Sequence, residues 1–441
     1  MPPVDRPDGS DLVRAVHLGH APNCSATGSI VGDMLLSAAA TAVLINSVAV
    51  WLAARAKAPS TDDAPPRLRR DRRGGVLLLP SSVPLGPARV ELTERGVQLA
   101  LAGGATLVGR VDAPRRPPDE VHLSVTERCP VGCSHCYISA TPTGRDADLD
   151  QALASLAELD AAGVHEIALG GGEASLSNAT LALAQEARQR GMIPNPTTSG
   201  AGLSPDLALQ LAEVVGQVNI SIDPGLRRAP TSDLGWRAIA LLQRAGVRVG
   251  VNTVLSAATW AQLDALAADL AAREIGEWQW LRLKPSGRGR STYLDDRLSP
   301  EQRLQIWPRL LELERAHGLR IRIDCAMVPF LAVHQVPVEA LEQAGVYGCP
   351  GGDRLASRTA EGRWLPCSFA GDLSEQEPTS FPEAWATDPT LTTWRTRAEK
   401  PPSPCGACAY RAVCRGGCRI VAAHLTGDPL APDPECPLVS G

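Results

Sequence analysis

The sequence lacks a strong excess of charge of either sign. Its 441 residues include 43 Lys and Arg against 48 Asp and Glu, which leaves a net charge of −5. So small an imbalance gives no reason to expect nucleic acid as a partner or a generally basic, membrane-binding surface. The length exceeds that of one ordinary domain and predicts two or three.

Evenly spread cysteines are also missing. Three of the twelve lie within eight residues near position 130, seven follow position 348, and Cys24 and Cys325 stand apart. Gaps of two and three residues do not suit a secreted disulfide framework, but they do bring thiolates onto one small centre, as metal and cluster sites require. We therefore expect a reducing compartment, with the catalytic part in the cytoplasm.

Charge is absent from residues 34–54, a stretch of 21 residues that is long enough to span a bilayer. The stretch is rich in Ala and only marginally hydrophobic, so a buried or partner-packed apolar helix is the alternative to a membrane anchor. Basic residues follow it and acidic residues precede it, so a spanning helix would leave the rest of the chain in the cytoplasm. A cleaved signal peptide fits poorly because the start of the chain is not basic.

The N-terminal part is predicted to contain a tail with a possible transmembrane helix (1–58), followed by a linker and a small β-meander (59–112). Within the tail, residues 20–29 are small and polar and contain Cys24. They suggest a modification site, a partner site or a fused precursor-like segment; the alternative is a disordered extracytoplasmic tail.

From residue 121 onward, predicted strands alternate with predicted helices. Ser204 and Ser299 each precede a Pro and a carboxylate, which is typical of a helix start. Such alternation predicts an α/β fold with a parallel barrel, or part of one, whose active site lies at the carboxyl ends of the strands. Pro194 and Pro196 are awkward for a central strand. The predicted strands cover 121–127, 164–170, 193–199, 217–223, 247–254, 278–284 and 319–324.

The first strand leads into a loop that contains Cys129, Cys133 and Cys136. Three thiolates on one loop can hold three corners of a [4Fe–4S] cube and leave the fourth iron open for a ligand that is not protein. A zinc knuckle in which His135 is the fourth ligand is the alternative. The second strand ends in three glycines and Glu173, where the backbone can approach a ligand closely and the carboxylate can accept a bond from an ammonium.

This combination resembles the radical SAM superfamily, whose signature is C-x3-C-x2-C followed by an aromatic residue, here Tyr137. The resemblance implies a partial (β/α)6 barrel at residues 113–330 and an open iron chelated by S-adenosylmethionine (SAM). It implies that the glycine run matches the family's GGE motif, although Ala174 stands where Pro is frequent. The residues that the resemblance assigns to cofactor binding are Tyr137, Gly171, Gly172, Glu173, Ser199, Ser221, Asp223 and Asn252, with Lys284 in a comparable place on the sixth strand.

The remaining seven cysteines resemble, gap for gap, the SPASM domain that follows many radical SAM barrels, here at residues 331–441. The resemblance implies two auxiliary [4Fe–4S] clusters; structural zinc is the alternative. One cluster would lie on Cys405, Cys408, Cys414 and Cys436, and the other on Cys349, Cys367 and Cys418. Seven thiols are one short of eight, so we expect an open or non-cysteine-ligated iron in the second cluster unless Cys325 reaches it; a buried structural thiol is the simpler interpretation of Cys325.

The resemblance predicts a radical SAM enzyme that modifies a peptide or protein, by a thioether or carbon–carbon crosslink or by side-chain oxidation. Its expected partners are that substrate and an electron donor such as flavodoxin or ferredoxin. Two alternatives stay open: a radical SAM dehydrogenase of a small molecule, and a non-catalytic, membrane-tethered iron–sulfur carrier or sensor.

Overall fold

The structure is a computed structural model that describes residues 88–93, 96–101, 106–110, 117–226, 232–343, 345–374 and 377–439. Its main sheet contains nine strands among these residues. They are β4 (Glu120–Thr126), β5 (Glu166–Gly171), β6 (Ile193–Thr198), β7 (Val218–Ser221), β8 (Val249–Leu255), β9 (Glu277–Arg282), β10 (Ile321–Ile323), β11 (Leu355–Arg358) and β12 (Trp364–Leu365).

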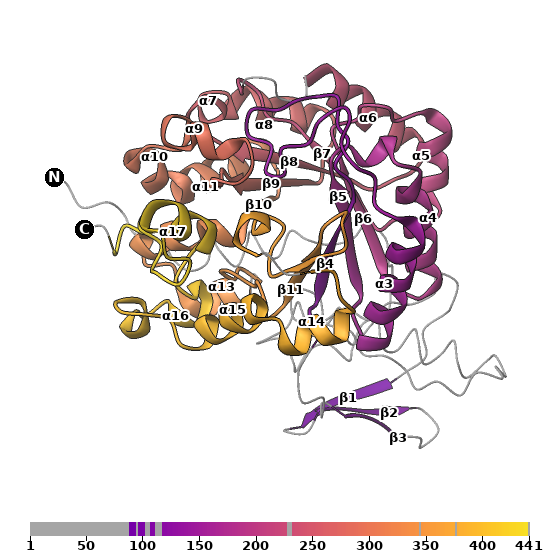
Figure 1. Ribbon diagram of the computed structural model, residues 1–441. Coiled ribbons are helices and arrows are strands. Elements are labelled where there is room, and N and C mark those ends of the chain that lie inside the picture. The colour runs from indigo at the N-terminus through magenta and orange to yellow at the C-terminus, as the bar shows by residue number, and fades with distance from the viewer. Residues whose placement is uncertain are drawn as a thin grey trace.

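The order of the sheet is β10-β9-β8-β7-β6-β5-β4-β11-β12, and only the β11–β12 pair is antiparallel. The sheet curves around an interior, and the helices lie on its outer side (Figure 1). Each strand from β4 to β10 overlaps a predicted strand. The α/β prediction, with a partial parallel barrel, is therefore confirmed.

Strand β6 shows how a central strand accommodates two prolines. Pro194 and Pro196 pair in register with Ile167 and Leu169 of β5. Pairing with β7 starts only at Thr197, after the second proline. Because proline has no backbone N–H, the ladder on the β7 side begins where ordinary residues resume.

The helices that cover the barrel begin where the sequence indicates. Ser204 accepts a bond from Leu207 N at 3.1 Å, and Ser299 accepts one from Gln302 N at 3.2 Å, so both predicted N-caps are present. The elements are α3 (Leu149–Ala162), η1 (Ala174–Leu176), α4 (Asn178–Gln189), α5 (Pro205–Ala212), α6 (Ser232–Arg244), α7 (Ala257–Trp260), α8 (Leu263–Ala272), α9 (Gly289–Asp296), α10 (Pro300–Leu304) and α11 (Ile306–His317).

The apolar core lies between the sheet and these helices. Leu156 and Leu159 of α3 are fully buried in the same cluster as Ile167 of β5. Leu149, the first residue of the same helix, is 37% exposed. With the core outside the sheet, the inner face of the barrel is left for polar residues and a cavity.

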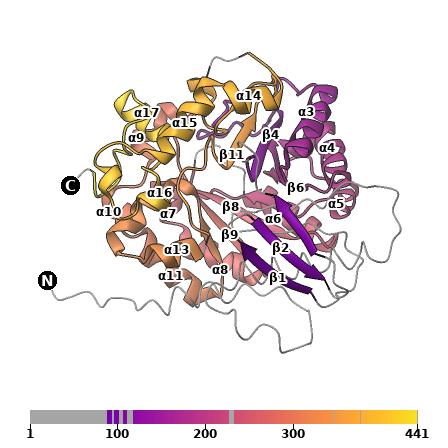
Figure 2. The same cartoon turned by 90° about the horizontal axis from the view of Figure 1, so that it is seen from below.

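The C-terminal part is joined to the barrel through the sheet. Strand β11 pairs in parallel with β4, from Leu355 opposite Glu120 to Arg358 opposite Leu123. Helix α14 packs against α3 on the same side of the molecule (Figure 2). The boundary expected between residues 330 and 331 falls inside α12. The elements are η2 (Cys325–Met327), α12 (Val328–Leu331), η3 (Ala332–His334), α13 (Val338–Gln343), η4 (Gly371–Leu373), α14 (Phe381–Thr387), α15 (Pro389–Glu399), η5 (Cys405–Ala407), α16 (Arg411–Cys414) and α17 (Arg419–Thr426).

Three further strands form a separate antiparallel sheet, β1 (Ala88–Thr93), β2 (Gly96–Leu101) and β3 (Thr106–Arg110). They lie within the segment for which the sequence predicts a β-meander. Residues 20–29 and 34–54 fall outside the described residues. Within the described ranges, no helix combines the length and the apolar character needed to cross a bilayer.

Candidate active site

The cysteine loop follows β4 and is closely packed. Cys129, Cys133 and Cys136 are each partly buried, and Ala140 N donates to Cys136 Sγ at 3.3 Å, a contact that stabilises a thiolate. Burial, together with the charges of Asp223, Cys136 and Cys129, raises the pKa of Cys133 to about 12. The three predicted ligands therefore lie together, as one cluster requires.

A segment after β9 holds this loop, and the sequence analysis missed it. Arg288 donates from its backbone N to Cys136 O and from Nε to Cys133 O, both at 2.9 Å, and from its guanidinium to Ala140 O at 2.6 Å. Gly287 has φ +55°, and a Cβ there would lie 2.5 Å from Cys136 O. The run of small and basic residues after the strand is the only signal in the sequence that could have suggested this role.

The glycine run at the end of β5 packs directly onto the residues that lead into the cysteine loop. Gly172 N donates to Thr126 O at 2.6 Å and Glu173 N donates to Arg128 O at 2.8 Å. Gly171 has φ +109°, and a Cβ there would lie 2.5 Å from Thr126 O; one on Gly172 would lie 2.4 Å from Arg128 O. Any side chain at these two positions would push the turn off the loop.

The Glu173 carboxylate is 1% exposed and connects β5 to the end of β6. It accepts bonds from Ser175 N at 3.0 Å, Ser175 Oγ at 2.7 Å and Ser199 N at 2.9 Å, and from the hydroxyls of Thr198 and Ser199. These five donors fill the roughly four lone-pair sites of a carboxylate. The Ser175 hydroxyl also contacts Ala201 O, so its hydrogen is shared between this carbonyl and the Glu173 carboxylate.

His135, inside the cysteine loop, is paired with Asp223. Its Nε2 lies 3.2 Å from Asp223 Oδ2, while Asp223 Oδ1 accepts a bond from Val254 N at 2.7 Å. Asp223 is therefore engaged with the loop and with β8, although the sequence suggested a cofactor contact. Ser221 and Asn252 pair in register on β7 and β8 and line the interior cavity.

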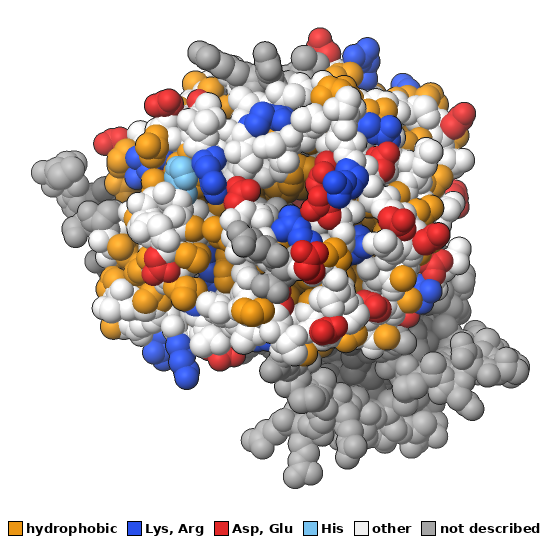
Figure 3. Space-filling view, in the orientation of Figure 1, with side chains coloured by type: hydrophobic (Ala, Val, Ile, Leu, Met, Phe, Trp, Pro, Cys, Tyr) orange, Lys and Arg blue, Asp and Glu red, His pale blue; other side chains and the backbone are white. Residues whose placement is uncertain are grey.

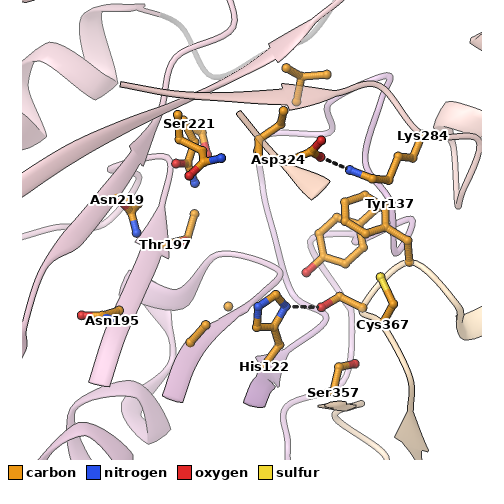
Figure 4. A pocket seen from close by; sticks show the side chains of 18 of the residues that line it. His122, Tyr137, Asn195, Thr197, Asn219, Ser221, Lys284, Asp324, Ser357 and Cys367 are labelled. Carbon is orange, nitrogen blue, oxygen red and sulfur yellow. Dashed lines mark hydrogen bonds and ion pairs between the residues drawn. The ribbon is translucent and has the colours of Figure 1, made fainter. Parts of the chain in front are cut away.

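The barrel encloses a cavity of about 1320 Å³. In Figure 4, Asn195, Thr197, Asn219 and Ser221 line one side and Tyr137, Lys284 and Cys367 lie across from them. The Tyr137 ring lies 4.7 Å from that of Phe369. Among the lining residues are the three cysteines of the loop and all the predicted cofactor residues, Tyr137, Gly171, Gly172, Glu173, Ser199, Ser221, Asp223 and Asn252.

Lys284 is a buried cation on the wall of this cavity. It forms an ion pair with Asp324, donates to Arg282 O at 3.3 Å, and its Nζ lies 4.5 Å from the Phe369 ring centre. Burial opposes its charge, but Asp324 and the charges of Cys418 and Cys325 outweigh burial and raise the pKa of Lys284. The sequence placed Lys284 at a strand end but gave no sign of these partners.

Four C-terminal cysteines form one group. Burial raises the pKa of Cys414 to about 12, with the charges of Cys436 and Cys405 contributing. Burial raises the pKa of Cys436 to about 11, with Cys405 and Cys408 contributing. Short turns around η5 and α16 bring the first three together, and the chain end brings the fourth. This grouping agrees with the set that the sequence resemblance implies.

Cys349, Cys367 and Cys418 form a second group. Cys349 and Cys418 are buried in one apolar cluster, and Cys367 packs against it. Burial raises the pKa of Cys367 to about 12, and the charges of Cys349 and Cys418 add to the increase. Thiols so placed ionise only beside compensating positive charge, which iron supplies.

Arg419, next to Cys418, supports an anionic group at this place. Its side chain is fully buried, and its Nε and one terminal nitrogen have no hydrogen-bond partner among the described residues. Its other terminal nitrogen reaches Gly351 O only at 3.4 Å, and Cys349 and Cys418 are the anionic groups that act on it. Buried donors without acceptors beside thiols fit the sulfides of an iron–sulfur cluster.

A site for a single metal ion requires a different arrangement of ligands from that of an iron–sulfur cluster. Within the described ranges, no three His, Cys, Asp or Glu residues form a group that could hold one ion. The thiolates of a cluster bind separate iron atoms around a cube, so they need not converge on one point.

Comparison with known proteins places the barrel in a class. Residues 123–270 match the profile of the Radical SAM superfamily. This stretch runs from β4 into α8 and contains the cysteine loop, the glycine run and the cofactor residues predicted on β6, β7 and β8. The barrel is therefore a radical SAM domain, and the resemblance seen in the sequence is confirmed.

The chain is similar to several characterised proteins over most of their length. It is 28% identical over 353 residues to the pre-heme d1 synthase of Dinoroseobacter shibae, covering 74% of this chain and 87% of that protein. It is 27% identical over 331 residues to the mycofactocin maturase MftC of Mycobacterium tuberculosis (71% and 81%). It is 26% identical over 344 residues to the PqqA peptide cyclase of Gluconobacter oxydans (73% and 91%). The chain is accordingly an enzyme of the radical SAM type.

Solved structures share the fold. Streptococcus suis SuiB bound to the precursor peptide SuiA matches with a TM-score of 0.61 and 17% identity, over 73% of this chain and 76% of that one. The enzyme anSMEcpe with bound AdoMet and a peptide matches with a TM-score of 0.56 and 15% identity, over 73% and 94%. At such low identity the likeness concerns the fold alone, and it covers more of the chain than the radical SAM profile does.

Proposed function

We propose that this chain is a radical SAM enzyme that modifies a peptide or protein, by forming a thioether or carbon–carbon crosslink or by oxidising a side chain. The observation that carries the proposal is the direct contact between the glycine run and the start of the cysteine loop, at the edge of a cavity of about 1320 Å³. Similarity to a peptide cyclase and to a maturase supports a peptide as substrate.

In this proposal, Cys129, Cys133 and Cys136 hold a [4Fe–4S] cluster with one iron open to SAM. When bound, these cofactors supply a 5′-deoxyadenosyl radical that takes a hydrogen atom from the substrate. The chain contributes position: Arg288 fixes the loop carbonyls, and the Glu173 carboxylate would accept a bond from the cofactor's ammonium in place of some of its present donors.

The remaining walls orient cofactor and substrate. Ser221 and Asn252, side by side on neighbouring strands, present polar groups for a carboxylate or ribose. Gly171 and Gly172 let the backbone approach the amino group of the cofactor. Tyr137, directly after the last cysteine of the loop, packs on Phe369 of the C-terminal part. The cavity holds these groups away from bulk water, which limits quenching of a radical.

The C-terminal part would carry two auxiliary clusters that pass electrons between an external donor, such as flavodoxin or ferredoxin, and the substrate. Cys405, Cys408, Cys414 and Cys436 form the first ligand set. Cys349, Cys367 and Cys418 contribute to the second. The buried cations Lys284 and Arg419 beside the second set would favour its reduced, more negative state.

Cleavage of SAM tests the proposal. The anaerobically reconstituted and reduced chain should convert SAM to 5′-deoxyadenosine. Replacing Cys129, Cys133 and Cys136 together with Ala should abolish the product while the C-terminal clusters remain. An unchanged yield in that variant would refute the assignment. Mass spectrometry of a candidate peptide co-expressed with the chain, with the triple variant as control, then tests the substrate class.

A second candidate is a small-molecule substrate of tetrapyrrole size. The similarity to a pre-heme d1 synthase, and to the AdoMet-dependent heme synthase of Nitratidesulfovibrio vulgaris at 24% identity over 333 residues, favours it. The two candidates differ in what stimulates the reaction. Faster formation of 5′-deoxyadenosine with a porphyrin precursor than with peptide would support the second candidate and contradict the first.

A further inference from the structure

Cys325 lies far in sequence from the C-terminal cysteine motif but close to it in the fold. It is the first residue of η2, directly after the edge strand β10. Its neighbour Ala326 is buried in the same apolar cluster as Cys349 and Cys418, and Cys367 packs against that cluster. Thus one edge of the curved sheet supplies Cys325, while the segments around β11 and β12 at the other edge supply Cys349 and Cys367.

Hydrogen bonds connect Ala326, the residue after Cys325, to Cys418 through two buried side chains. Arg282 donates to Ala326 O at 2.9 Å and to Asp433 Oδ2 at 2.6 Å. The same Asp433 oxygen accepts the backbone N–H of Cys418 at 2.9 Å. The start of η2 and the start of α17 are therefore fixed relative to each other by charge-assisted bonds.

The same thiols surround one buried cation. Cys325 and Cys367 both line the cavity together with Lys284 and its partner Asp324. Figure 4 shows Lys284, Asp324, Tyr137 and Cys367 on the same side of this cavity. Cys349 and Cys367 also lie close enough to Cys325 to interact with it electrostatically.

We propose that Cys325 is the fourth cysteine ligand of the iron–sulfur cluster held by Cys349, Cys367 and Cys418. This inference rests on the proposed auxiliary clusters and changes one expectation from the sequence, since it leaves no open iron in the second cluster. A cluster closed by four thiolates transfers electrons but does not bind substrate directly.

The experiment uses the full chain with Cys129, Cys133 and Cys136 replaced by Ala, so that only the C-terminal clusters remain. We call this variant the parent. Two further variants carry Cys325→Ala or Cys325→Ser in the parent. Cys367→Ala in the parent is the matched control for loss of a ligand, because Cys367 lies in the same group. Iron and zinc per chain are measured, with electron paramagnetic resonance before and after mild oxidation and after adding a small thiol.

With two closed cubes, the parent should contain about eight irons per chain, and its spectra should not change when the thiol is added. Cys325→Ala should lower iron to between about four and seven per chain. It should also produce either a [3Fe–4S] signal on oxidation or a thiol-dependent spectrum, as Cys367→Ala does. Cys325→Ser preserves the packing of a small buried side chain, so altered spectra in this variant separate ligation from structural support.

Unchanged iron and spectra in both Cys325 variants would overturn the inference and identify a structural thiol. A parent whose spectrum already responds to the thiol would also overturn it, and this measurement does not depend on how the Cys325 variants fold. Either result leaves the auxiliary clusters themselves in place. Near-stoichiometric zinc with little iron in the parent would instead refute the auxiliary clusters of the proposed function.

Discussion

Arg282 provides the strictest test of how the two parts of the chain are joined. It lies on β9, and its side chain is buried. Its guanidinium donates to both oxygens of Asp433, at 2.6 and 3.1 Å, and to Glu435 Oε2 at 2.7 Å. Asp433 and Glu435 directly precede Cys436 in the chain. We predict that Arg282→Met destabilises the fold and weakens the hold on the C-terminal cysteines.

The expected loss of stability depends on which partners each carboxylate keeps when Arg282 is replaced. Glu435 keeps Tyr293 at 2.9 Å, Arg297 at 2.5 Å and Arg303 at 3.0 Å, so its charge stays compensated. Asp433 is 1% exposed, and Arg282 is its ion-pair partner within the described residues. Removing one partner of a buried pair costs about 3–5 kcal/mol. With a urea m value of about 3 kcal/mol/M for a chain of this size, the unfolding midpoint should fall by about 1–1.7 M.

Urea unfolding of the iron-loaded chain, followed anaerobically by circular dichroism, measures this shift. Arg309→Met is the matched control: its partners Asp264 and Glu312 are exposed, so its loss should cost less than about 1 kcal/mol. Combining Arg282→Met with Asp433→Asn should cost clearly less than the sum of the single changes, because no unpaired charge remains. Equal midpoints for Arg282→Met and Arg309→Met would refute the reasoning.

Three further predictions concern the barrel. Gly171→Ala places a Cβ 2.5 Å from Thr126 O at φ +109°. We expect the free energy of unfolding to fall by about 1–3 kcal/mol and the affinity for SAM to fall with it. Normal affinity in equilibrium dialysis would contradict this prediction. Arg288→Ala removes two bonds to loop carbonyls, so mild chelation should strip the first cluster sooner than the others, as timed iron release would show. Burial raises the pKa of Glu314 from 4.5 to about 7, against a hydrogen bond from Ile321 N and the charge of Arg320. This pKa is higher in the folded chain than in the unfolded chain, so protonated Glu314 favours the folded state. Its contribution to the free energy of unfolding is complete below about pH 4.5, and about 3 kcal/mol of it is lost as the pH rises through 7. Glu314→Gln should flatten urea midpoints between pH 5 and 8, and an unchanged slope would argue against this origin.

Charge on the surface does not single out a docking region on the face shown in Figure 3, where basic and acidic side chains are interspersed. The wall of the cavity, by contrast, carries a concentration of charge. There Glu277 interacts with Arg248, Arg320 and Arg322, at 3.4, 2.8 and 2.7 Å, and gives the wall formed by β8, β9 and β10 a strongly polar character.

The strands from β4 to β10 could be predicted from the sequence because each is a short apolar run followed by its own helix. Local periodicity and capping residues such as Ser204 determine such units, and their parallel order follows from the short crossovers. The cysteine loop and the glycine run could also be predicted, because the residues that carry their chemistry are contiguous in the sequence. The cofactor role predicted for Asp223 remains a prediction, and the structure adds its contact with His135.

The sequence by itself determined the parallel barrel and predicted which residues hold iron–sulfur clusters, since both depend on local spacing. Only the tertiary structure decided which distant parts of the chain contact those residues. Strand β11 joins β4, Arg288 holds the cysteine loop, and Cys325 lies beside the cysteines of a motif that begins after it. These contacts join segments far apart in the chain, and no local pattern encodes them, because they arise from the curvature of the sheet and from pairing of buried charges across it.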